Sequence, residues 1–182
     1  MTSNQLNKVS KFLSFVLRHK PDAIGLELDQ YGWANINELI SKAYTSNGLS
    51  NLSFDLIQQV VETNEKKRFI ISDDNLRIRA NQGHSVDVDL QLRQMEPPEF
   101  LYHGSATRFL DNILAQGLIP QERLYVHLSS NIDTAKAAGQ RYGKPIILKI
   151  KARAMYESGF KFYLSENEVW LTKQVPAELI CI

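Results

Sequence analysis

The sequence predicts an α+β protein made of two small units. Three helical patterns followed by a hairpin pattern occupy the first half, and short strands alternate with helices in the second. Between them lies Glu96-Pro97-Pro98-Glu99, where two consecutive prolines disfavour a continuous helix or sheet. We therefore expect one unit over residues 1–95 and a second over residues 96–182.

The first unit is expected to begin with an amphipathic helix that ends before Pro21. Ser3 is a candidate cap, and a short extended stretch is expected over residues 24–28. The buried face of the helix should consist of the apolar residues that recur at helical spacing, namely Leu6, Val9, Phe12, Leu13, Val16 and Leu17.

Two further helices are expected, each with a capping residue in front of its apolar stripe. Asn35 precedes the second helix, which should end near Asn47-Gly48, and Ser53 precedes the third. The inward residues are expected to be Ile36, Leu39, Ile40 and Ala43 in the second helix and Phe54, Ile57, Val60 and Val61 in the third.

A hairpin is expected after the third helix, with strands over residues 68–72 and 76–80. Three helices and a two-stranded wing are the element order of a winged helix-turn-helix, in which the third helix commonly reads DNA. Here that helix carries Asp55 and Glu62 and no basic residue before Lys66, so phosphates would repel it. A small packing domain, or one with a compact basic site elsewhere, is favoured over a DNA reader.

The second unit should contain six short strands and two helices. The helices are expected over residues 107–116 and 133–142, ended by Gly117 and Gly143. The last three strands follow one another without helices, so we expect them to be antiparallel. The strands are expected over residues 100–103, 125–128, 146–151, 160–164, 168–172 and 178–182.

Composition is that of a globular protein, with 43% hydrophobic and 23% charged residues among 182. The sequence has no apolar run of ~18 residues and no signal-peptide pattern, so neither a membrane span nor secretion is expected. The single cysteine, Cys181, rules out an internal disulfide framework, fits a reducing cytoplasm and is expected to be buried in the final strand. A net charge of +1 argues against coating long nucleic acid but allows a local anion site.

The sequence lacks the motifs of phosphate loops, dinucleotide-binding turns and serine hydrolases. Its four histidines are His19, His84, His103 and His127. None stands at ligand spacing with cysteine or a carboxylate, so no metal site is expected.

The remaining candidates for a functional site in the first unit are arginine and histidine residues. Arg18-His19 ends the first helix, where basic residues also complement the helix dipole. Arg77 and Arg79 alternate with apolar residues and should share one face of a strand, as two residues of a solvated face would. The run Asn81-Gln82-Gly83-His84-Ser85 suits a ligand-binding loop and an ordinary turn alike.

Comparable signals occur in the second unit. His103-Gly104-Ser105 ends a strand in front of a helix; it suits a ribose or phosphate, and equally a capped turn. His127 lies between apolar neighbours just before Ser129, where a satisfied core histidine is the structural alternative. Arg141 lies at the end of the expected 133–142 helix, so the dipole explanation applies again. Each signal is weak alone.

Together and in this order, these segments resemble the RNA 2′-phosphotransferase (KptA) family over nearly the whole chain. The most diagnostic segment is Arg79-Ala80-Asn81-Gln82-Gly83-His84-Ser85. The others are Ser10-Lys11-Phe12-Leu13-Ser14-Phe15-Val16-Leu17-Arg18-His19, Gly32-Trp33, Tyr102-His103-Gly104-Ser105, Val126-His127-Leu128-Ser129, Arg141-Tyr142-Gly143 and Asn167-Glu168-Val169-Trp170-Leu171. Two departures are Ser105, where the family often has threonine, and Glu168, where glycine is common.

The resemblance implies a winged-helix-like lobe that binds an RNA 2′-phosphate and an ADP-ribosyltransferase-like lobe with a split β-sheet that binds NAD+. It implies transfer of an internal 2′-phosphate, as at a tRNA splice junction, to NAD+ through an ADP-ribosylated phosphate. The products would be 2′-hydroxyl RNA, nicotinamide and ADP-ribose 1″,2″-cyclic phosphate. NAD+ would be a co-substrate, with no metal, no membrane and no obligate protein partner.

The resemblance also implies roles for individual residues. Arginines would grip the migrating phosphate in a cleft between the lobes, while His19 would act in proton transfer or orientation. The catalytic group would be Arg18, His19, Arg79 and Arg141, the NAD+ contacts His103, Gly104, Ser105, His127 and Ser129, and the substrate-facing residues Asn81, Gln82, His84 and Ser85. Val169 stands where ADP-ribosyltransferases commonly have a glutamate, which a phosphate nucleophile does not need. Arg68 and Arg123 are candidate RNA-backbone contacts, with an ordinary surface role equally open.

Two other functions remain open from the sequence. One is an ADP-ribosyltransferase that modifies a nucleic-acid terminal phosphate or a protein and stops after the first step. The other is a regulator that binds nucleic acid through the winged helix. The acidic third helix disfavours the regulator, and the phosphate-gripping arginines favour transfer of the phosphate itself.

Overall fold

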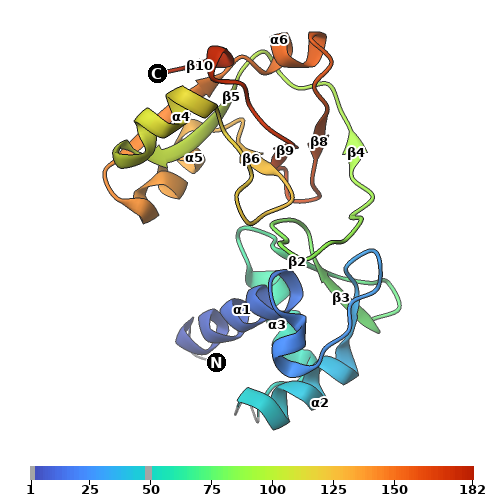
Figure 1. Cartoon of the computed structure of the whole chain (residues 1–182). Coiled ribbons are helices and arrows are strands. Elements are labelled where there is room, and N and C mark those ends of the chain that lie inside the picture. Colours follow the sequence, from blue (N-terminus) through green and yellow to red (C-terminus); the bar gives the residue numbers. More distant parts are fainter. Residues whose placement is uncertain (1–2, 48–50) are drawn as a thin grey trace. The chain divides into compact units, whose positions relative to one another are not determined.

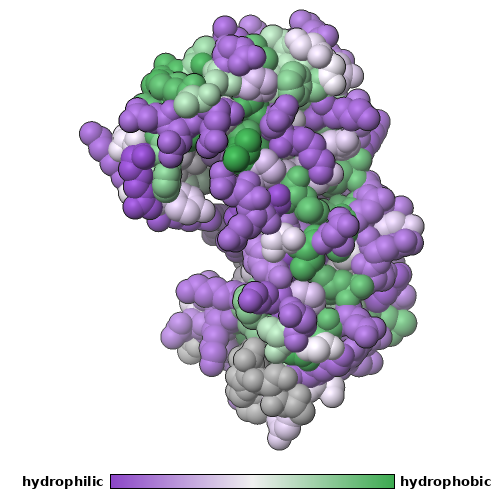
Figure 2. Space-filling view, in the orientation of Figure 1, coloured by the Kyte–Doolittle hydropathy of each residue, from purple (hydrophilic) through white to green (hydrophobic). Residues whose placement is uncertain are grey.

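The computed structural model describes residues 3–47 and 51–182 and has an α+β architecture. The chain divides into two compact units, Met1–Gln91 and Leu92–Ile182 (Figure 1). Each unit has its own hydrophobic core. Figure 2 shows hydrophilic side chains over much of the visible surface of both, with hydrophobic residues in smaller groups. None of the described helices is long and apolar enough to cross a membrane.

The first unit contains three α-helices and one small antiparallel sheet. The helices are α1 (Ser3–Arg18), α2 (Ile36–Asn47) and α3 (Phe54–Thr63). The sheet has the order β1-β3-β2, with β1 at Ala34–Asn35, β2 at Phe69–Ile71 and β3 at Arg77–Ala80. The expected hairpin is therefore confirmed as β2 and β3, while β1 was not predicted because two residues carry no periodicity.

The predicted helix caps hold where the structure describes them. The Asn35 side chain accepts a hydrogen bond from the backbone N–H of Glu38 at 3.0 Å, and Ser53 accepts one from Leu56 at 3.3 Å. Ser3 is different, since it lies within α1 rather than in front of it. The predicted stop at Gly48 lies outside the described residues.

The extended stretch predicted over residues 24–28 is wrong at its start. A 3₁₀ turn, η1 (Pro21–Ile24), occupies that position, and residues 26–29 then belong to no strand. Proline at the first position presets a helical φ, which favours the turn over an extended chain. The apolar face of α1 is nevertheless buried as expected, with Leu13, Val16 and Leu17 fully covered.

The second unit contains two separate antiparallel sheets. One has the order β10-β7-β5, formed by β5 (Leu101–Ala106), β7 (Pro145–Ile150) and β10 (Ile180–Cys181). The other has the order β4-β8-β9-β6, formed by β4 (Arg93–Gln94), β6 (Val126–Leu128), β8 (Phe162–Leu164) and β9 (Trp170–Thr172). The last three predicted strands are thus not one meander. β8 and β9 pair, but β10 joins β7 in the other sheet.

The helices of this unit are shorter than predicted. The 107–116 segment is a 3₁₀ turn, η2 (Thr107–Phe109), followed by α4 (Leu110–Gln116). The 133–142 segment is α5 (Ile132–Gly139) followed by η3 (Gln140–Tyr142). A third helix, α6 (Ala152–Glu157), was not predicted. A final 3₁₀ turn, η4 (Ala177–Leu179), leads into β10, where the thiol of Cys181 is free and the residue half-buried rather than buried.

Two glycines set how α5 packs on β5. A Cβ placed on Gly104 would lie 1.6 Å from the backbone carbonyl oxygen of Ala135, and one on Gly139 would lie 2.5 Å from that of Ser105. Neither position can hold a side chain unless the helix moves. Glycine at position 104 therefore allows close packing of helix on strand, and the space beside its Cα on that face is already filled.

Candidate functional site

The C-terminal end of α1 forms the centre of a polar cluster in the first unit. Arg18 donates from Nη2 to the backbone carbonyl of Arg68 at 3.4 Å, and its guanidinium lies 5.7 Å from the centroid of the Phe69 ring. The Arg18 carbonyl accepts hydrogen bonds from the backbone N–H groups of Ser85 at 2.9 Å and Val86 at 3.3 Å. These bonds tie the 81–86 loop to the end of α1.

His19 is held by the same loop. Its Nδ1 lies 3.0 Å from Ser85 Oγ, and that hydroxyl also donates to the Arg18 carbonyl at 3.4 Å. A hydroxyl has one proton. When that proton goes to the carbonyl, Ser85 Oγ accepts a hydrogen bond from Nδ1–H of His19. Ser85 thus orients an exposed imidazole whose Nε2 can take part in proton transfer.

Arg79 stands on β3 beside Trp33. The Arg79 guanidinium lies 4.7 Å from the Trp33 ring centroid and that of Arg77 lies 5.4 Å from it. The predicted alternation is therefore right, because both arginines project from one face of the strand to the same ring. Such a cation–π contact fixes the orientation of a guanidinium.

His84 lies beneath this cluster and is buried, with 1% of its surface exposed. Its ring nitrogens have no hydrogen-bond partner among the described residues. Burial, together with the positive charges of Arg18, His19 and Arg79, lowers the pKa of His84 to about 3. His84 is therefore neutral at pH 7, and these cations surround a side chain that adds no charge.

The remaining residues of the loop are also largely covered. Asn81 donates from Nδ2 to the Lys67 carbonyl at 2.7 Å, while Asn81 Oδ1 and Gln82 Oε1 are buried without a partner among the described residues. A buried acceptor that nothing satisfies costs free energy, so a ligand donor at this position would be favoured. The roles predicted for Asn81, Gln82, His84 and Ser85 toward substrate stay predictions.

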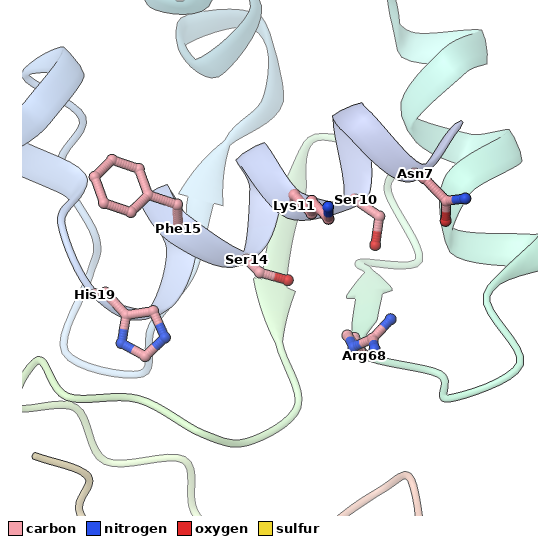
Figure 3. Close-up of a pocket in the computed structure, with 7 residues that line it drawn as sticks. All are labelled: Asn7, Ser10, Lys11, Ser14, Phe15, His19 and Arg68. Carbon is pink, nitrogen blue, oxygen red and sulfur yellow. The ribbon is translucent and has the colours of Figure 1, made fainter. Parts of the chain in front are cut away.

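A shallow pocket of about 320 Å³ opens beside His19 (Figure 3). Along α1 its wall combines polar side chains with the exposed ring of Phe15, and Arg68, just before β2, lies opposite. Sequence reasoning did not single out this wall, although the three- to four-residue spacing of small polar residues on α1 was a usable signal. The lining residues are Asn7, Ser10, Lys11, Ser14, Phe15, His19 and Arg68.

In the second unit, His103 separates two strands. β5 meets the residue that directly follows β6 at an isolated bridge, where Tyr102 and Ser129 exchange backbone hydrogen bonds of 2.8 Å. In an antiparallel ladder the next such pair would join Gly104 to His127. Instead, Nδ1 of His103 lies 2.9 Å from the His127 carbonyl and takes the place of the Gly104 amide.

The split has a consequence for Gly104. Peptide groups two residues apart in a strand point the same way. The N–H and C=O of Gly104 therefore point to the β6 side, as those of Tyr102 do. Among the described residues, β5 is bridged on this side only at Tyr102, to Ser129 just after β6, so the backbone of Gly104 offers a donor and an acceptor there. A primary carboxamide matches such a pair.

The other residues predicted for this site have varied surroundings. Arg123 donates from Nη1 to Nδ1 of His127 at 2.8 Å, so the proton of that imidazole is on Nε2. Burial lowers the pKa of His103, which favours its neutral form. Ser129 Oγ accepts from the Asn131 N–H at 3.0 Å, and Ser105 is buried.

Arg141 and the turn before β9 complete the comparison with the predicted residues. Arg141 is exposed in η3, and its grouping with Arg18, His19 and Arg79 stays a prediction. Glu168 has a φ of 60°, in the left-handed region that glycine adopts without strain. That conformation explains why glycine suits this position, where the sequence departs from the family pattern. No group of three or more potential ligands among the described residues could hold a metal ion.

Comparison with known proteins gives one consistent result. Residues 4–174 match the model of the family described as "RNA 2'-phosphotransferase, Tpt1 / KptA family". A relative from Pseudomonas fluorescens, named probable RNA 2'-phosphotransferase, is 58% identical over 99% of this chain and 98% of its own length. Relatives with the same name from Acaryochloris marina and Flavobacterium johnsoniae are 54% and 51% identical, over 96% and 99% of this chain and 95% and 98% of their own.

Proposed function

Since the chain belongs to the RNA 2'-phosphotransferase, Tpt1 / KptA family, we propose that it transfers an internal 2′-phosphate from RNA to NAD+. The first unit would be a winged-helix-like lobe that binds the phosphate. The second would be an ADP-ribosyltransferase-like lobe that binds NAD+. Junctions left by tRNA splicing are a natural source of such phosphates.

The observation that carries the proposal is the cluster of Arg18, His19 and Arg79 around the neutral His84. Guanidinium groups bind phosphate oxygens in pairs and stabilise the charge that builds up during transfer. Because His84 is neutral, it adds no charge of its own to this basic cluster, whose character suits an anion such as phosphate. At the edge of this cluster, the imidazole of His19, which Ser85 orients, supplies a group for proton transfer.

The fit to NAD+ rests on the split between β5 and β6. The N–H and C=O of Gly104 match the carboxamide of nicotinamide as donor and acceptor, and His103 keeps the two strands apart. In NAD+ the nicotinamide ring is a pyridinium, so it departs from C1″ as a neutral molecule without protonation by an acid. The RNA phosphate that attacks C1″ is already an anion. The half-buried Val169, where related transferases commonly have glutamate, is consistent with a reaction that needs no base at this step.

The second step closes the reaction. The ribose O2″ attacks phosphorus and its proton is accepted, the bond from phosphorus to the RNA 2′-oxygen breaks, and that oxygen takes a proton. The products are 2′-hydroxyl RNA and ADP-ribose 1″,2″-cyclic phosphate, with nicotinamide released earlier. Arg18, Arg79 and Arg141 would hold the phosphate throughout, and His19 would move or orient the proton.

The test is turnover of an oligoribonucleotide with one internal 2′-phosphate in the presence of NAD+. We expect 2′-hydroxyl RNA and the cyclic phosphate as products, with at least a ~100-fold loss for Arg79→Gln, about 3 kcal/mol of barrier. Arg77→Gln is the matched control, since Arg77 contacts the same Trp33 ring but is not among the charges that lower the pKa of His84, and it should keep activity within about threefold.

Two results would change the assignment. A persistent RNA–ADP-ribose adduct from the wild-type protein would mean that it stops after the first step. No conversion of the 2′-phosphorylated RNA at any NAD+ concentration would contradict the proposed function altogether.

A further inference from the structure

The pocket along α1 extends beyond the groups that the proposed chemistry uses. Asn7, Ser10 and Ser14 are three or four residues apart, so they fall on neighbouring parts of one helix face. In Figure 3 the side chains of Ser10 and Ser14 point to the side of α1 on which Arg68 lies, with His19 at one end and Asn7 at the other. The pocket is thus a trough that begins at His19 and carries a row of polar side chains beside the ring of Phe15.

The charge of the trough is one-sided. Its lining includes the basic residues Lys11 and Arg68, and there is no carboxylate among the seven residues that form it. A concave site lined by one sign of charge concentrates counter-ions of the other sign. Its natural ligand is therefore an anion rather than an amine or a metal ion.

Hydrogen bonds made by Asn64 orient the side chains of the trough that can donate to such an anion. Ser10 Oγ accepts from Asn64 Nδ2 at 3.2 Å, which leaves the Ser10 hydroxyl proton to be donated elsewhere. Asn64 Oδ1 in turn accepts from Arg68 Nη1 at 3.5 Å and from the Lys66 backbone N–H at 3.1 Å. One asparagine thereby holds both sides of the trough in position.

The trough is continuous with the candidate phosphate site. His19 lines it directly, and the Arg68 carbonyl accepts the hydrogen bond from Arg18 Nη2. An anion held by Lys11 and Arg68 would thus lie next to one held by Arg18 and His19. In RNA that carries an internal 2′-phosphate, the group one step along the chain is a phosphodiester.

On the basis of the proposed function, we propose that this trough binds the RNA phosphodiester that adjoins the 2′-phosphate. Lys11 and Arg68 contact its non-bridging oxygens, and the Ser10 and Ser14 hydroxyls donate to it or to the neighbouring ribose. Phosphate contacts of this kind fix position without reading sequence. The trough would thus make the enzyme favour an RNA chain over an isolated 2′-phosphate and place the migrating phosphate against Arg18 and His19.

The test is equilibrium binding without NAD+, followed by fluorescence anisotropy of a labelled single-stranded oligoribonucleotide with one internal 2′-phosphate. Lys11→Gln and Arg68→Gln should each raise Kd roughly tenfold, the loss expected for one hydrogen bond to a charged group. Each should also reduce the slope of log Kd against log salt by about 0.7. Lys8→Gln is the matched control, because Lys8 is exposed on α1 but does not line the trough.

A second ligand separates this site from the catalytic one. A nucleoside 2′-phosphate has no phosphodiester, so Lys11→Gln should leave its competition constant within about twofold. The inference is overturned if Lys11→Gln binds the oligoribonucleotide like Lys8→Gln, or if it weakens both ligands by the same factor, which would place Lys11 at the 2′-phosphate. Because these readouts need no turnover, they stand even if the protein fails to convert the RNA.

Discussion

Neutral His84 should make the first unit lose stability in mild acid. The native state keeps this side chain unprotonated down to about pH 3, whereas the unfolded chain protonates it near the ordinary value of 6.5. Below pH 6.5 the unfolded state thus binds more protons, and the unfolding free energy falls as pH falls. The stability is fully present above pH 6.5 and is lost progressively toward pH 3.

The size of the effect follows from the shift. Each pKa unit corresponds to about 1.4 kcal/mol, and pH 5 lies about 1.5 units below the unfolded-state pKa, so His84 alone should remove about 2 kcal/mol between pH 8 and pH 5. Most carboxylates stay ionised over this range. Replacing His84 with glutamine, which does not titrate, should remove this part of the pH dependence.

The assay is urea unfolding at pH 8, 6.5, 5.5 and 5, followed by the fluorescence of Trp33. The two tryptophans lie one in each unit, so a Trp170→Phe background makes Trp33 the reporter of the first unit. The quantity of interest is the difference in pH dependence between the His84 and His84→Gln proteins. If both lose the same free energy between pH 8 and pH 5, the reasoning that His84 is neutral and buried beneath the arginines is refuted.

Two further predictions concern packing and positioning. Gly104→Ala should lower the free energy of unfolding by about 4 kcal/mol or more, because the new Cβ meets the Ala135 carbonyl; urea unfolding followed by Trp170 fluorescence measures this loss. Gly159→Ala is the control: it has open space around it and a φ of 94°, so it should cost about 1–2 kcal/mol. Equal losses for the two variants would contradict the packing argument. Ser85→Ala should lower the single-turnover rate of phosphate transfer roughly fivefold by freeing His19, while Ser85→Thr should restore it; a threonine variant as slow as the alanine variant would show that the hydroxyl is not what matters.

Local pattern in the sequence predicted most of the first unit. Apolar residues at helical spacing placed all three helices, and the caps at Asn35 and Ser53 set the starts of the second and third. The alternation of Arg77 and Arg79 correctly predicted a shared face. These features depend on residues within a few positions of one another, which is why one sequence suffices to read them.

The trough on α1 and the split between β5 and β6 were harder to predict from the sequence. The wall of the trough needed Arg68, which reaches α1 only through the tertiary fold. The glycine of His103-Gly104-Ser105 looked like a place for a ligand to approach, yet one side of it is filled by α5. Its other side is opened by a side chain of the preceding residue, through a hydrogen bond to a strand far along the chain.

The sequence by itself determined the three helices and the hairpin of the first unit, the α+β class and the identities of the polar residues. Only the tertiary structure decided their surroundings: that β10 pairs with β7 rather than β9, that His84 is buried and neutral, and that Ser85 holds His19. The physical reason is range. Periodicity and capping act between neighbours in the chain, whereas strand pairing, burial and the pKa of a buried group depend on residues brought together from distant positions.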